Sequence, residues 1–186
     1  LAIGMYLLPG WWALALAPVY IGFIFGRFAA EYILMLHAVC HRVLFKRKHR
    51  LWNHYIPCVL GPFWGCTPTS FFSHHVGMHH PENNLHDDLS CTLYYQRDRF
   101  FDFLHYWARF FFTGNIHLIR YFSVRGRKKL KRKFVVGEIS WLVFVSCMLF
   151  VDWTATLIVF VVPFLLIRWL MMCGNFAQHA FVDVND

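Results

Sequence analysis

The chain has 186 residues, of which 58% are hydrophobic, 20% are aromatic and only 15% are charged. This composition excludes a water-soluble domain, which could not bury so much apolar surface, and it predicts a single all-α integral membrane protein. The formal net charge of +8 is concentrated in two basic runs, at residues 46–50 and 125–133. Such runs are typical of loops that stay in the cytoplasm, although they would also suit an acidic headgroup or a phosphate-bearing carrier.

The first predicted element is a membrane-spanning helix near the N-terminus. An apolar run at residues 11–25 is just long enough to cross a bilayer, and Arg27 marks the opposite interface. If the helix continues through Arg27 and Glu31, which are spaced i,i+4, then His37 and His41 share one helical face about 15 Å beyond the membrane. The basic run that follows predicts that both histidines are cytoplasmic. Residues 1–8 are interpreted as the end of an earlier span.

Residues 55–72 form an apolar stretch that is interrupted by three prolines and two glycines. A single crossing here would place the next histidines on the far side of the membrane from His41. We therefore expect a broken, interfacial or re-entrant element, whose freed backbone groups must be satisfied by protein or water. It leads into a second histidine segment, in which His75 and His79 are spaced i,i+4 and His80 adds a neighbouring ring.

The rest of the chain predicts an interfacial helix followed by a transmembrane hairpin. Residues 100–122 mix aromatic with charged side chains, which favours a helix that lies in the membrane interface. Residues 134–151 and 154–173 are two apolar spans joined by a short polar turn, the second of them interrupted by Pro163 and Arg168. Because the basic run before the hairpin fixes its entry side, the hairpin should return Asn175 and His179 to the cytoplasm.

These histidines favour a redox metal site. Neutral imidazole suits iron, copper or zinc, and many histidines with little thiolate or carboxylate favour iron over structural zinc. In combination, His-x3-His at 37–41, His-x3-His-His at 75–80 and Asn-x3-His at 175–179 resemble the histidine boxes of the membrane fatty acid desaturases. The resemblance covers residues 11–183, and the boxes are far more specific together than singly.

The resemblance implies a di-iron enzyme that uses O2 as co-substrate to introduce a double bond into a lipid or acyl-CoA chain. Electrons would come from a cytochrome b5 or a ferredoxin, and no catalytic side chain beyond the metal ligands is expected. By position, the iron ligands would be His37, His41, His75, His79, His80 and His179. Asn175 would join the metal site through water.

Some neighbours of the boxes are expected to support the ligands. The five-residue spacing from His74 to His79 is poorer α-helical registry than the spacing from His75, so His74 is expected to lie outside the ligand set. Asp87, Asp88 and Asp183 could orient ligand rings, although solvated loop carboxylates are an equally good interpretation of the first two. The unpaired histidines are interpreted as ordinary interfacial residues; they are His54, His86, His105 and His117.

The pattern departs from the family in one respect, since a His-x2-His-His box is expected after the last span and the chain stops at Asp186. We therefore expect residues 1–186 to be one partial desaturase domain that is inactive alone. A related di-iron hydroxylase of alkanes, sterols or carotenoids and a non-catalytic membrane remnant remain as alternatives. The endoplasmic reticulum is the expected membrane, with a plastid membrane as the alternative, and no nucleic-acid partner is expected.

Overall fold

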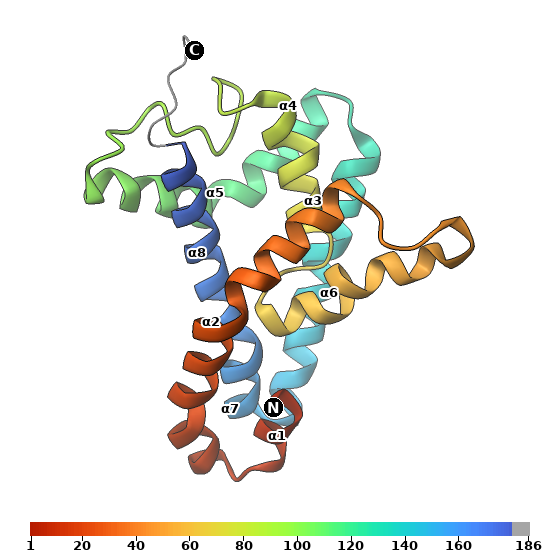
Figure 1. Ribbon diagram of the computed structural model, residues 1–186, viewed down its shortest axis with the longest axis vertical. Helices are drawn as coiled ribbons and strands as arrows, with labels where there is room; N and C mark the ends of the chain where they lie inside the picture. The colour runs from red at the N-terminus through yellow and green to blue at the C-terminus, as the bar shows by residue number, and fades with distance from the viewer. Residues whose placement is uncertain (180–186) are drawn as a thin grey trace. The chain divides into compact units, whose positions relative to one another are not determined.

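The computed structural model describes residues 1–179, and every regular element in that range is helical (Figure 1). The expectation of an all-α membrane protein is confirmed. The chain divides into two compact units. The first contains residues 1–70 and 136–167, and the second contains residues 71–135 with the chain from 168 onward.

The elements follow one another in a simple order. The first elements in chain order are the helices α1 (Ala2–Leu7) and α2 (Gly10–His41). The short helical turns η1 (Arg47–His54), η2 (Tyr55–Leu60) and η3 (Gly61–Trp64) come next, and the short helix α3 (Ser70–His74) follows them. Those that follow are η4 (His75–His79), α4 (His80–Glu82), α5 (Phe100–Val124), α6 (Lys128–Val151), α7 (Trp153–Thr156), η5 (Leu157–Val161) and α8 (Val162–Gln178).

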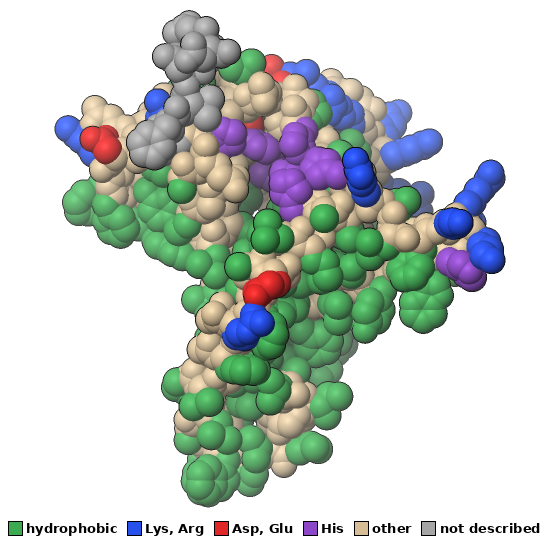
Figure 2. All heavy atoms as spheres, in the orientation of Figure 1, with side chains coloured by type: hydrophobic (Ala, Val, Ile, Leu, Met, Phe, Trp, Pro, Cys, Tyr) green, Lys and Arg blue, Asp and Glu red, His purple; other side chains and the backbone are tan. Residues whose placement is uncertain are grey.

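Within residues 1–179, three helices are long and apolar enough to cross a membrane. They are Gly10–His41, Lys128–Val151 and the continuous run Trp153–Gln178. In the most apolar 18-residue stretch of each helix, only 17%, 22% and 33% respectively is buried within the protein. Most of their apolar side chains therefore face outward, as lipid-exposed helices require. Figure 2 shows hydrophobic side chains exposed over much of the helical surface.

The first of these helices, α2, is continuous to its last histidine. It passes through Arg27 and Glu31, which form an exposed i,i+4 ion pair on its surface. The expected continuation to His37 and His41 is therefore confirmed. The preceding helix α1 is separate from α2, because Leu8 is extended and Pro9 caps the new helix.

The predicted hairpin is present and its two helices run antiparallel. In the first unit the ring of Trp141 stacks on Phe164 at 4.5 Å, and Phe144 meets Phe160 at 5.0 Å. The two pairs have nearly the same sum of residue numbers, which is the pattern of an antiparallel pair. Asp152 makes the turn, and its side chain accepts a hydrogen bond from the backbone of Ala155 at 2.8 Å.

The second span of the hairpin continues past the two residues that interrupt its apolar run, Pro163 and Arg168. The helical run extends from Trp153 to Gln178. A π turn at Leu157–Val161 ends two residues before the proline. Proline removes one backbone donor, and a local π turn lets neighbouring groups re-form the hydrogen bonds that an α-helix would lose.

The segment expected to be broken is a chain of short turns whose course depends on two close backbone contacts. Gly65 has a left-handed φ of +73°, and a Cβ there would lie 2.2 Å from the backbone nitrogen of Phe164. A Cβ on Gly137 of α6 would lie 1.8 Å from the carbonyl oxygen of Pro68. Glycine is therefore required at both positions, because any side chain would displace backbone atoms.

The second unit is built from α5, the histidine segment of α3, η4 and α4, the start of α6 and the end of α8. Helix α5 is formed as predicted, and it does not meet the criteria for a span among the described residues. One cluster of buried apolar residues joins it to the histidine segment and α6; its buried members are Met78, Leu118, Tyr121, Phe122 and Phe134. A second joins it to α8; its buried members are Phe103, Tyr106, Met172 and Phe176. Burial of these aromatic faces fixes α5 within this unit.

Candidate metal centre

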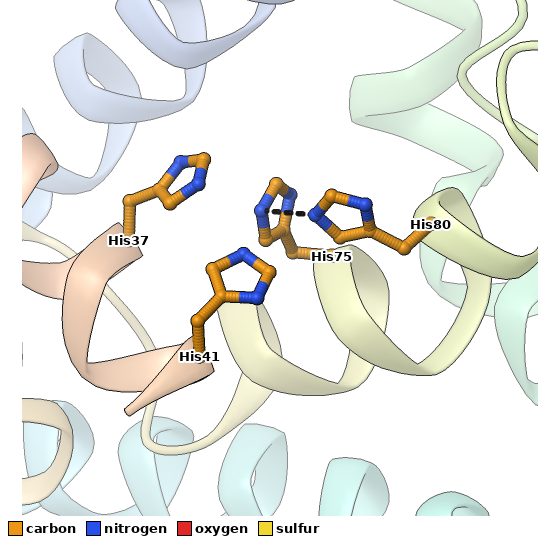
Figure 3. Close-up of side chains that lie close together, drawn as sticks. All are labelled: His37, His41, His75 and His80. Atoms are coloured by element: carbon orange, nitrogen blue, oxygen red, sulfur yellow. Dashed lines mark hydrogen bonds between the residues drawn. The ribbon is translucent and has the colours of Figure 1, made fainter. Parts of the chain in front are cut away.

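The first histidine pair lies on the last turn of α2, in the first unit. The rings of His37 and His41 have their centroids 4.9 Å apart, and a ring nitrogen of one lies within 4.8 Å of a ring nitrogen of the other (Figure 3). Both side chains are exposed. The i,i+4 spacing on a regular α-helix is what brings them together, as predicted.

The second histidine segment, in the second unit, is not a regular α-helix. Helices α3 and α4 are joined by a π turn at His75–His79, in which hydrogen bonds run from i to i+5. Across this turn, rings that are five residues apart become neighbours, as well as rings that are four residues apart. Figure 3 shows His75 beside His80, whose Nε2 atoms are 3.0 Å apart. The rings of His74 and His79 are parallel within 4°, with centroids 6.3 Å apart.

This geometry changes the argument about registry. On an α-helix, the five-residue spacing from His74 to His79 would align the two side chains poorly. The π turn at His75–His79 aligns them instead. His75 and His79 still lie near each other, with centroids 5.8 Å apart. The local helix type was not readable from the spacing, because His-His-x3-His-His contains both i,i+4 and i,i+5 pairs.

A buried carboxylate fixes the ring of His79. The Nδ1 of His79 is 2.6 Å from Oδ2 of Asp88. Asp88 is buried and also accepts hydrogen bonds from the backbone of Asn84 at 2.9 Å, the backbone of Ser90 at 2.8 Å and the Ser90 hydroxyl at 2.7 Å. Burial alone would raise the pKa of Asp88, but its bonds to His79 and Ser90 lower it below its usual range. The carboxylate therefore holds a proton on Nδ1 and leaves Nε2 of His79 for a metal.

The structure distinguishes two of the three aspartates that the sequence places close to the histidine boxes. Asp88 orients a histidine ring, as one of the two interpretations proposed. Asp87 is exposed, and Oδ2 of Asp87 pairs with the guanidinium of Arg125 at 2.6 Å. Asp183 lies outside the described residues.

The third segment brings Asn175 and His179 from α8 and its end to the same part of the second unit. The ring of His179 meets that of His79 with centroids 5.4 Å apart. The amide nitrogen of Asn175 donates to the hydroxyl of Tyr106 at 2.6 Å and to the carbonyl of Ser90 at 3.2 Å. Sequence reasoning missed Tyr106 and Ser90, because neither belongs to a histidine box and both partners are distant in sequence.

Two imidazole nitrogens in this cluster have no hydrogen-bond partner within the described chain. They are Nε2 of His74 and Nδ1 of His179, and both are buried. Burial, with a smaller contribution from His79, lowers the pKa of His74 to about 4, and burial also lowers the pKa of His179. Both rings are therefore neutral at pH 7, which is the form that binds metal.

The histidines outside the boxes have other neighbours or lie exposed. His86 contacts Asp87 and the ring of Tyr94, and the ring of His105 packs on Tyr95. His117 lies 3.4 Å from the hydroxyl of Thr113, and His54 is exposed. These surroundings agree with their interpretation as ordinary surface or interfacial residues.

A model of the fatty acid desaturase family matches residues 9–186. The chain belongs to the fatty acid desaturase family. No curated protein and no solved structure matches it in the same comparisons. Membership supports a lipid desaturase-like function and a desaturase-type oxidoreductase in general, and the match covers all three histidine segments of this desaturase-family chain.

The donor atoms of this desaturase-family chain fit a metal. Imidazoles from α2, from the π turn and from the end of α8 are gathered in pairs, and the buried ones are neutral. The second unit also supplies the carboxylate support that a metal-binding imidazole commonly has. These features agree with a metal-binding role for the histidine segments.

Proposed function

We propose that the protein is an O2-dependent di-iron desaturase that introduces a double bond into a lipid acyl chain. The observation that carries the proposal is the family match over residues 9–186, which includes every histidine box. The pairing of imidazoles within each unit supports it.

In this proposal the iron ligands are those expected from the boxes, namely His37, His41, His75, His79, His80 and His179, with Asn175 acting through water. Iron, when bound, would supply the reductive activation of O2 that no side chain can provide for an unactivated carbon–hydrogen bond. The part of Asp88 is to hold Nδ1 of His79 protonated. The part of Asn175 is to tie the end of α8 to Tyr106 and to the loop that carries Asp88.

The reaction needs an external electron donor for its balance. Two adjacent methylene groups of the acyl chain lose two hydrogen atoms, the donor supplies two electrons, and with two protons the O2 is reduced to two molecules of water. A cytochrome b5 or a ferredoxin would serve as donor. The substrate would be a membrane lipid or an acyl-CoA. The histidine boxes would face the cytoplasm at the endoplasmic reticulum, with a plastid membrane as the alternative.

The test is lipid profiling of a host membrane that contains the intact protein, with saturated acyl-lipid and acyl-CoA supplied in separate assays. We expect products two mass units lighter than the substrate. His79→Ala should lower their formation at least about 100-fold, because the ring supported by Asp88 is lost. The matched control is His86→Ala, since His86 is exposed and lies outside the boxes; it should retain activity.

Two other outcomes would overturn the proposal. A product that gains one oxygen atom would instead identify a hydroxylase. An unchanged lipid profile, together with less than one iron per purified chain, would favour the non-catalytic membrane protein.

A further inference from the structure

We propose that His74 is a metal ligand, binding through Nε2 an ion that it shares with Nε2 of His79 and Nδ1 of His179. This inference rests on the proposed function only in assuming that the histidine segments bind metal. It extends the ligand set to a residue that the spacing argument had set aside. All three residues belong to the second unit.

The first support is the register of the π turn. Because the turn brings residues five apart into line, the rings of His74 and His79 are parallel within 4° and their centroids are 6.3 Å apart. Two imidazoles on one ion have each ring nitrogen about 2.1 Å from the metal, which allows centroids to be roughly 5–6.5 Å apart. The spacings His74 to His79 and His79 to His179, at 6.3 and 5.4 Å, both fall in this range.

The second support is the pair of buried nitrogens without partners. Within residues 1–179, Nε2 of His74 and Nδ1 of His179 are buried and have no hydrogen-bond partner. A buried polar atom in this state is destabilising and needs a reason. Both atoms belong to rings that neighbour the same third ring, and a metal ion would satisfy both of them at once.

The third support is the surroundings of two of the proposed ligands, His79 and His74. His79 uses Nδ1 for Asp88, so its coordinating atom is Nε2. The ring of His74 packs edge-on against Phe110, with centroids 5.2 Å apart. An apolar wall on that side holds the ring in place without offering it a hydrogen bond.

The experiment uses cobalt(II) as a spectroscopic probe in the purified intact protein. His74→Cys replaces the imidazole with a potential thiolate ligand, and His74→Ser is the size-matched variant without one. We expect a thiolate-to-cobalt charge-transfer band in His74→Cys that is absent from His74→Ser and from the wild-type protein. A parallel pair at the exposed His86, His86→Cys and His86→Ser, should show no band in either variant.

Metal content gives an independent measurement. His74→Gln should bind about one metal ion fewer per chain than the wild-type protein, measured by elemental analysis of monodisperse material. His74→Gln with wild-type metal content, or His74→Cys with bound cobalt and no charge-transfer band, would overturn the inference and leave the proposed function intact. A wild-type protein that binds neither iron nor cobalt would overturn both.

Discussion

Each unit contains a carboxylate that accepts several hydrogen bonds, partly buried in the first unit and buried in the second. In the first unit Glu138 accepts hydrogen bonds from the hydroxyls of Thr67 and Ser70, and close packing around glycine dominates the same region. In the second unit Asp88 has four donors, one of them a histidine ring. The difference indicates that steric fit determines the backbone course in the first unit, while a polar network determines the orientation of side chains in the second. Substitutions in the two units should therefore affect different properties of the protein.

The largest effect is expected where backbone atoms are nearest, in the first unit. Gly137→Ala would place a Cβ 1.8 Å from the carbonyl of Pro68, and neither helix α6 nor the broken segment can yield without backbone movement. We expect a loss of stability of about 3 kcal/mol or more, measured as the thermal unfolding midpoint in detergent.

The control for this prediction is Gly22→Ala on α2, because a Cβ at Gly22 would meet nothing within 4 Å. Alanine in a helix interior is favoured over glycine by roughly 0.5–1 kcal/mol, so this variant should be unchanged or slightly more stable. Equal behaviour of the two variants would show that steric fit does not determine the first unit.

An intermediate effect is expected at Asp88, and it should appear chiefly in metal affinity. Asp88→Asn keeps the shape but turns one acceptor oxygen into a donor, which must then face a donor from His79, Ser90 or Asn84. We expect metal affinity to fall by about 10–100-fold, with a loss of stability of roughly 2 kcal/mol. Metal titration followed by thermal unfolding would measure both.

Asp87→Asn is the matched control, since Asp87 precedes Asp88 and its ion pair with Arg125 is exposed. An exposed ion pair contributes about 0–1 kcal/mol, so this variant should bind metal like the wild-type protein. If Asp88→Asn also retained wild-type affinity, the polar network would be structural only.

The smallest effect is expected at Tyr106, at the edge of the same network. Tyr106→Phe removes a buried hydroxyl that accepts from Asn175 at 2.6 Å and donates to the carbonyl of Ser90 at 3.3 Å. The expected loss is about 1 kcal/mol in the free energy of unfolding. Tyr94→Phe removes an exposed hydroxyl, whose bond to the carbonyl of His86 is 3.3 Å long, and it should have a smaller effect. A larger loss of stability in Tyr94→Phe than in Tyr106→Phe would contradict the importance of burial for these hydroxyls.

Much of the fold could be predicted because it follows from hydropathy and charge. The apolar runs indicated the three spans, and the polar residue Asp152 indicated the turn between two of them. The prolines and glycines of residues 55–72 indicated the broken segment. All these features act over a few neighbouring residues, so they are visible in the sequence itself.

The parts of the site that could not be predicted depend on backbone hydrogen bonds or on distant partners. The spacing of four histidines does not reveal that His74 as well as His75 neighbours His79, because the contact between residues five apart depends on a π turn. The bond from Asn175 to Tyr106 joins residues 69 positions apart, and no local pattern indicates it. The passage of the helix through Pro163 likewise depends on the π turn before it.

The π turn between α3 and α4 also determines how this segment responds to a change of length. It contains one residue more than an α-helical turn would need. Removal of Val76 would leave His74 four residues from His79, and His75 four residues from His80, which are the natural neighbours of an ordinary α-helix. Insertion of a residue would separate both pairs around the helix axis. The histidine arrangement is therefore more tolerant of shortening than of lengthening, a direction that a motif written as fixed spacings does not convey.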